Sequence, residues 1–126
     1  MVILGVALAT VVSFIASAAL YAVPPVSRLI TSRSTARPGI PIAVQMLLVV
    51  LRSLIVSCLL AGLLIAAHWH GAGPGALLGL ALSLLPLVLL LGGVVHENTP
   101  VPVAAIHLAD WIAKLIIIGL LVGLFI

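Results

Sequence analysis

Four long apolar runs, separated by short turn-rich breaks, make up most of this sequence. Each run has about the 20 residues that an α-helix needs to cross the hydrocarbon core of a bilayer. Their length and the lack of two-residue alternation favour helices over strands. The runs cover residues 2–23, 41–67, 75–95 and 101–126. The sequence therefore predicts an all-α membrane protein in which residues 1–126 form one domain, a four-helix transmembrane bundle.

The composition excludes most soluble functions. Of the 126 residues only 6% are charged, and the mean hydropathy is +1.54, whereas a soluble domain carries about 25% charged residues. The sequence has no nucleotide-binding glycine loop, serine-hydrolase motif or zinc-protease motif. Aromatic residues are few, and the basic residues form no stripe of the kind that binds nucleic acid. We therefore expect a protein that is not an enzyme, takes no cofactor, contacts the lipid bilayer and binds no nucleic acid.

The arginines predict how the helices are oriented. Arg28, Arg33 and Arg37 lie in the first loop, while the loops at 69–74 and 96–100 contain no Lys or Arg. Because cytoplasmic loops carry an excess of basic residues, the first loop is expected in the cytoplasm and both termini outside. The first run lacks the positive segment that precedes the apolar part of a secretory signal. It is therefore expected to be a retained anchor of a multi-pass protein of the plasma (inner) membrane.

Ionisable residues inside two of the apolar runs are the best pointer to function. His107, Asp110 and Lys114 are spaced three and four residues apart and share one face of the last helix, and Arg52 lies in the second run. An ionisable side chain at membrane depth costs about 2.5 kcal/mol or more if it faces lipid, so such groups normally face protein or water. Asp110 can pair with Lys114 and His107 along its own helix, or with Arg52 across the bundle. The four residues predict a polar pathway or an ion-pair network.

Two functions are open for these four residues. If they line a pathway, the protein is a channel or transporter for protons, ions or small solutes, because His titrates near neutral pH and a His–Asp pair can relay protons. A chain this small would then act as a homo-oligomer to enclose the pathway. If the residues only orient helices, the protein is a non-catalytic accessory or scaffold subunit of a larger membrane complex. The excess of positive charge argues against a cation site at Lys114.

Histidines near the ends of the spans suggest two metal sites. Imidazole and carboxylate groups suit zinc and similar cations, and four such groups are expected near the cytoplasmic boundary. They are His96, Glu97, His107 and Asp110. His68 and His70 form an HxH at the opposite boundary. The HxH is a weak signal, because its two side chains point apart on a helix.

Small residues recur every four positions in all four runs. The recurring residues are Gly5, Ala9, Ser13 and Ser17; Ser53, Ser57 and Ala61; Gly75, Gly79 and Ser83; and Gly119 and Gly123. Such faces let helix backbones approach closely in lipid, so they predict a tightly packed bundle. Pro86 lies in the middle of the third run and lacks the amide N–H that would bond the carbonyl of Leu82. It predicts a static kink in that helix.

Three local patterns carry a family resemblance. The first run ends in an aromatic residue and prolines at Tyr21–Pro25, and a Gly/Leu-rich third run begins at Gly75. A short polar loop then leads to a last helix with an early acid, Asp110, and a glycine-rich end from Gly119 to Gly123. In these respects the chain resembles a family of small uncharacterised bacterial membrane proteins, classed under a domain of unknown function. The resemblance implies four helices and a shared role for Asp110, and it supplies no activity.

Overall fold

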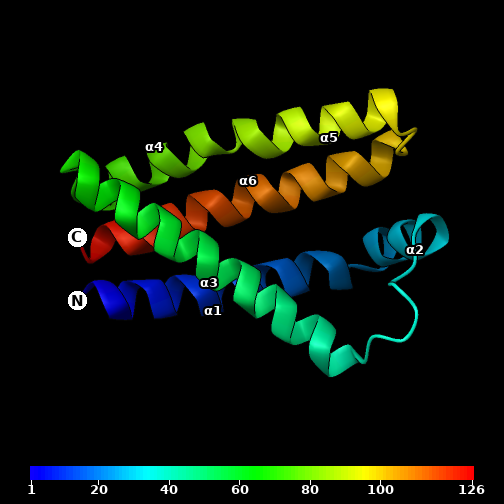
Figure 1. Ribbon diagram of the computed structural model, residues 1–126, viewed down its shortest axis with the longest axis horizontal. Helices are drawn as coiled ribbons and strands as arrows, with labels where there is room; N and C mark the ends of the chain where they lie inside the picture. The colour runs from blue at the N-terminus through cyan, green and yellow to red at the C-terminus, as the bar shows by residue number, and fades with distance from the viewer.

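Six α-helices and no strands make up the fold. The computed structural model describes all 126 residues. The helices are α1 (Val2–Ala22), α2 (Pro24–Arg33), α3 (Ile42–Ala67), α4 (Ala72–Leu82), α5 (Leu84–His96) and α6 (Val101–Leu124). Helices α1, α3 and α6 each form one span, and α4 and α5 together form another, so four spans are long and apolar enough to cross a membrane (Figure 1). The prediction of an all-α protein with four spans is confirmed.

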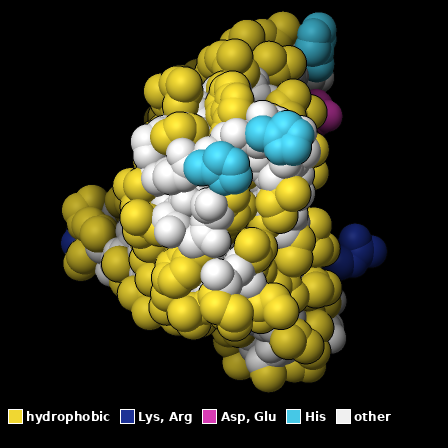
Figure 2. Space-filling view, turned by 90° about the vertical axis from the view of Figure 1, so that its left-hand side faces the viewer, with side chains coloured by type: hydrophobic (Ala, Val, Ile, Leu, Met, Phe, Trp, Pro, Cys, Tyr) yellow, Lys and Arg dark blue, Asp and Glu magenta, His cyan; other side chains and the backbone are white.

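Both termini lie at the same end of the bundle (Figure 1). Near them, the Phe125 side chain lies directly against Gly5. Figure 2 looks at this end, where hydrophobic side chains predominate and histidines lie among them. The opposite end holds α2 and the following loop, which carry the arginines of the first loop. The fold thus separates an end with the termini from an end with α2, and the placing of the termini outside the cell stays a prediction.

Helix α2 lies where the sequence pattern predicts only a loop. The Ser/Thr/Pro-rich stretch after α1 forms a ten-residue helix instead. Pro24 and Pro25 stand at its first positions, where a backbone N–H has no partner within the helix anyway. The hydroxyl of Thr31 donates to the carbonyl of Ser27 at 2.8 Å, which satisfies a polar group locally. Because α2 packs against both α1 and α6, it covers part of the bundle rather than extending away from it.

Helices α4 and α6 approach so closely that their backbones touch. A Cβ built on Gly75 would overlap the carbonyl of Gly119, and one built on Gly79 would overlap the carbonyl of Leu115. At the end of the helices the N–H of Gly71 donates to the carbonyl of Gly123 at 3.1 Å. We call this contact, formed by residues 71–79 and 115–123, the glycine clamp. Gly119 and Gly123 of α6 therefore pack against residues of the same chain, Gly71 and Gly75.

The core extends from this clamp toward α1 and α3. Its largest fully buried side chains are Leu60 and Leu64 of α3 and Ile118 and Val122 of α6. Ala9 of α1 belongs to the same cluster. The small residues of α1 are buried against neighbouring helices, so α1 and α6 also run close together.

The third span breaks in the middle, close to the proline. Helix α4 ends at Leu82 and α5 begins at Leu84, with Ser83 between them. The N–H of Ser83 is shared between two carbonyls, and its hydroxyl donates to the carbonyl of Leu80 at 2.5 Å. Pro86 cannot donate to the carbonyl of Leu82, so the helix changes direction here. Helix α5 therefore does not continue in the direction of α4, which the glycine clamp holds against α6.

Helix α3 crosses the bundle obliquely (Figure 1). It contacts α1, α4 and α6 but makes no contact with α5. Because α3 is joined to α4 by the short turn at residues 68–71, the two helices are close at that end and separate toward the end that holds α2. A lateral gap therefore opens between α3 and α5, and α6 lies behind it.

Candidate functional site

Asp110 and Lys114 form a buried ion pair on α6. The Lys114 Nζ lies 3.2 Å from Asp110 Oδ2, and the two residues are only 6% and 7% exposed. Their spacing of four residues places them one turn apart on the same face. The hydroxyl of Ser17, on α1, donates to the other carboxylate oxygen, Oδ1. Both oxygens of Asp110 thus have partners, and the pair is the most deeply buried charge in the chain.

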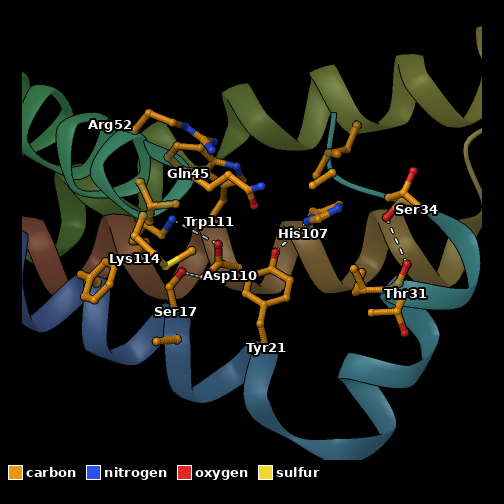
Figure 3. A pocket seen from close by; sticks show the side chains of 18 residues that line it. Ser17, Tyr21, Thr31, Ser34, Gln45, Arg52, His107, Asp110, Trp111 and Lys114 are labelled. Atoms are coloured by element: carbon orange, nitrogen blue, oxygen red, sulfur yellow. Dashed lines mark hydrogen bonds and ion pairs between the residues drawn. The ribbon is translucent and has the colours of Figure 1, made fainter. Parts of the chain in front are cut away.

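His107 contacts Tyr21 rather than Asp110. The Tyr21 hydroxyl and His107 Nδ1 are 2.6 Å apart, and their rings lie 5.8 Å apart and tilted. Tyr21 is one turn beyond Ser17 on α1, and His107 is one turn before Asp110 on α6. Figure 3 shows the two α1 side chains facing the two α6 side chains. The expected bond between His107 and Asp110 is not formed, because α1 supplies a nearer partner to each.

Ser17 and Tyr21 are the site residues that sequence reasoning misses. Ser17 is expected as one of the small packing residues, and Tyr21 as part of the boundary at the end of the first run. Their spacing of four residues is the signal that could have found them, because it is about one helical turn, as is the three-residue spacing of His107 and Asp110 on an antiparallel neighbour. Only the register between α1 and α6, however, shows which residues meet.

Arg52 does not pair with Asp110. Its guanidinium carbon lies 5.5 Å from the centroid of the Trp111 ring, and Lys114 Nζ lies 4.8 Å from the same ring. The predicted Arg52–Asp110 pair is replaced by this arrangement because Lys114 and Ser17 already occupy the carboxylate. Arg52 is exposed and forms no salt bridge, so its charge is balanced only by the π face of an indole.

A cavity of about 1110 Å³ lies in front of the ion pair, between α1, α2, α3 and α6. Its polar and ionisable lining consists of Ser17, Tyr21, Thr31, Ser34, Thr35, Gln45, Arg52, His107, Asp110, Trp111 and Lys114. Figure 3 shows these side chains converging from α1, α3 and α6, with Thr31 and Ser34 at the α2 side. Because Thr31 and Ser34 are themselves exposed, the cavity reaches the surface at the end of the bundle that holds α2.

A second cavity, of about 270 Å³, reaches the same ion pair from another side. Ser17, Asp110 and Lys114 line both cavities. On α1, Leu20 lines the small cavity and Tyr21 the large one, and consecutive residues of a helix point about 100° apart. The cavities therefore flank the contact between α1 and α6, with the ion pair as their common wall.

Buried hydroxyl groups continue the polar seam from the ion pair toward the termini. Ser13 donates to the carbonyl of Thr10 at 3.1 Å, and the hydroxyls of Thr10 and Ser57 are 3.4 Å apart. Ser57 in turn donates to the carbonyl of Ser53 at 2.8 Å. The Ser53 hydroxyl is buried and has no hydrogen-bond partner. Polar groups thus follow the contact of α1 with α3 for about one turn beyond the level of Lys114, from Ser13 to Thr10.

The predicted inner metal set of His96, Glu97, His107 and Asp110 is not assembled, and the HxH of His68 and His70 stays a prediction. No three His, Cys, Asp or Glu side chains come together as a metal site would require. His96 and Glu97 are exposed at the end of α5, whereas Asp110 is buried on its ion pair. His70 Nδ1 lies 3.0 Å from the carbonyl of Ile126. The inner set fails because its residues lie at different depths of the bundle, which the sequence alone could not show.

The fold and the site together define a class: a multi-pass helical membrane protein with an ion pair buried between its first and last spans. The chain belongs to the family described as protein of unknown function (DUF1761), which matches residues 4–123. This confirms the resemblance to an uncharacterised family that the sequence suggests. No curated protein and no solved structure matches the chain.

Proposed function

We propose that this protein is a small membrane transporter that moves protons, and that the Asp110–Lys114 pair is the group at which they exchange. The observation that carries the proposal is that this pair, buried among apolar helices, forms the common wall of two cavities. A pair that only orients helices needs no cavity beside it. Through the large cavity the pair communicates with the end of the bundle that holds α2, and the small cavity adds a second open space beside it.

The neighbouring groups favour protons over metal cations. Tyr21 and His107 stand one turn from the ion pair, on the side of the opening near α2. Chains of Asp and His residues inside membrane spans are typical of proton relays. Arg52 and Lys114 repel a cation that enters the large cavity, whereas a proton needs only a succession of groups that accept and release it.

The proposal includes a homo-oligomer. The small cavity is lined by α1 and α6 alone, so a second copy on that side would separate it from lipid. Because polar groups do not face hydrocarbon without a partner, we expect association of two copies through α1 and α6. Cysteine cross-linking at Ala109, which lines this cavity and is exposed, tests this arrangement. A protein that stays monomeric in lipid and still transports would remove the oligomer from the proposal.

The decisive experiment is proton flux in liposomes. The purified protein is reconstituted with a pH-sensitive dye inside, and a pH gradient is imposed in either direction. Asp110→Asn keeps one oxygen acceptor for Ser17 but cannot carry the charge, so we expect it to abolish flux. Glu97→Gln is the matched control, because Glu97 is the other acid of the chain and is exposed at the end of α5. We expect that variant to transport like the wild type.

Two results would overturn this proposal. One is a wild-type protein that moves no protons under any gradient while it remains folded and monodisperse. The other is an Asp110→Asn variant with normal helicity and normal flux. Either result would favour the second function considered for the sequence, a non-catalytic accessory or scaffold subunit in which the pair orients α1 and α6.

A further inference from the structure

The gap between α3 and α5 contains an apolar groove. The groove has a volume of about 380 Å³ and is formed by side chains of α3, the kinked third span and α6. Val56 and Leu59 form one wall, Pro86 and Leu89 form the other, and Trp111 lies at its floor. It exists because α3 makes no contact with α5. The groove is therefore open to the hydrocarbon region of the bilayer along its length.

A free positive charge stands at one end of this groove. Arg52, Val56 and Leu59 are spaced four and three residues apart, so they share one face of α3. Trp111 and Leu90 line both the groove and the large polar cavity that contains Arg52. The side chains of a helix lean toward its N-terminus, which for α3 is the end of the bundle that holds α2. Arg52 therefore extends from the groove toward that membrane boundary.

The chain offers no acid to balance Arg52. It contains two acidic residues, and Asp110 is occupied by Lys114 and Ser17. Glu97 is exposed at the end of α5 and forms no salt bridge with Arg52. Association with a second copy would add more positive than negative charge, because each copy carries a net charge of +3. An anion from outside the chain can therefore balance Arg52, at the point where the large polar cavity adjoins the apolar groove.

We propose that the gap between α3 and α5 is a binding site for an anionic membrane phospholipid. The phosphate lies at Arg52, and one acyl chain lies in the groove over Trp111. Charge complementarity selects the head group, and the apolar groove selects a ligand that carries a hydrocarbon chain. This proposal does not depend on proton transport, because lipid binding needs no gradient and the acyl chain lies in the groove, although Arg52 itself lines the large cavity.

Trp111 provides a direct test, because bromine atoms on an acyl chain quench the fluorescence of a nearby indole. Trp69→Phe leaves Trp111 as the only tryptophan. The protein is reconstituted in vesicles that contain brominated phosphatidylglycerol or brominated phosphatidylcholine at equal mole fraction. We expect the anionic lipid to be favoured about fivefold, as one basic group near a membrane surface predicts. Trp111→Phe, which leaves only Trp69 at the far end, should show no preference.

Variants separate the two parts of the site. Arg52→Gln should remove the preference for the anionic lipid, while Arg52→Lys should retain it. Arg37→Gln is the matched control, since Arg37 lies in the loop after α2 and should change nothing. Val56→Phe fills the groove but keeps Arg52, so it should weaken quenching by both lipids. Emission maximum and elution volume verify that each variant is folded.

Three results would overturn the lipid site. Equal quenching by the two lipids in the parent protein would exclude selection by charge. A preference that survives in Arg52→Gln would move the selection elsewhere. Unchanged quenching in Val56→Phe would show that no acyl chain occupies the groove. Since none of these measurements uses a pH gradient, failure of the lipid site and failure of proton transport are distinguishable.

Discussion

The two halves of α6 make opposite contacts. From Leu115 to Gly123 the helix packs backbone to backbone against α4, through the glycine clamp, and no charged group is present. From His107 to Lys114 it carries an ion pair of its own and meets α1 through hydrogen bonds, and cavities flank the contact. The difference shows that one helix supplies both the most closely packed contact of the bundle and its buried polar contact. Close packing at one end holds the other end in register.

This comparison predicts that the polar half is the more sensitive to loss of a partner. Asp110→Ala leaves Lys114 buried without a counter-charge, and breaking a buried pair in this way costs about 3 kcal/mol or more. The double variant Asp110→Ala/Lys114→Met should recover most of this stability, because an apolar pair replaces the ionic one. Unfolding in mixed micelles, followed by circular dichroism, measures both. A double variant no more stable than the single one would contradict the account.

The glycine clamp should respond to volume rather than to charge. In Gly119→Ala the new methyl group meets the carbonyl of Gly75, and forcing helices apart in this way costs about 2 kcal/mol. Gly62→Ala is the matched control, because a Cβ there meets nothing within 4 Å and Ala favours a helix by about 0.5–1 kcal/mol. The two variants, compared in the same unfolding assay, should move stability in opposite directions. Equal effects would show that the clamp is not tight.

A smaller effect is expected at the outer part of the polar half. Tyr21→Phe removes the hydroxyl that meets His107 at 2.6 Å and keeps the ring in place. One hydrogen bond of this kind contributes about 1 kcal/mol, so a loss of that size is the expected result. His107→Phe should give no further loss when added to Tyr21→Phe, since the bond is already gone. Additive losses in the double variant would mean that His107 has another partner.

The smallest effect is expected for the hydroxyl of Ser57, in the contact between α1 and α3. Ser57→Ala removes the hydroxyl that faces Thr10 at 3.4 Å, and Thr10 keeps its bond to the carbonyl of Val6 at 2.8 Å. Hydrogen bonds between membrane helices contribute about 0.6 kcal/mol on average, which sets the expected size. A loss as large as that of Tyr21→Phe would extend the polar half further toward the termini.

The sequence predicts the spans well, because length and hydropathy decide which segments can cross a bilayer. It also singles out Asp110 and Lys114, since charges stand out in apolar helices. It does not predict that α1 supplies Ser17 and Tyr21, or that Arg52 turns to Trp111, because those contacts depend on how two helices are aligned. The hydrophobic pattern alone does not determine that alignment, because an apolar helix face has a similar free energy against lipid and against another apolar helix. Close packing of side chains and backbones determines which faces meet.

The two halves of α6 also differ in when they can form. The glycine clamp joins consecutive spans through the short loop at residues 97–100, so it can close as soon as the last span enters the membrane. The Ser17–Asp110 bond joins residues 93 apart in the chain, and it forms only when the last span returns to the first. Until then Asp110 and Lys114 lack the protection of α1. Assembly of the site therefore requires the first and last spans to meet, and a chain in which they do not meet leaves both charges of α6 without cover from α1.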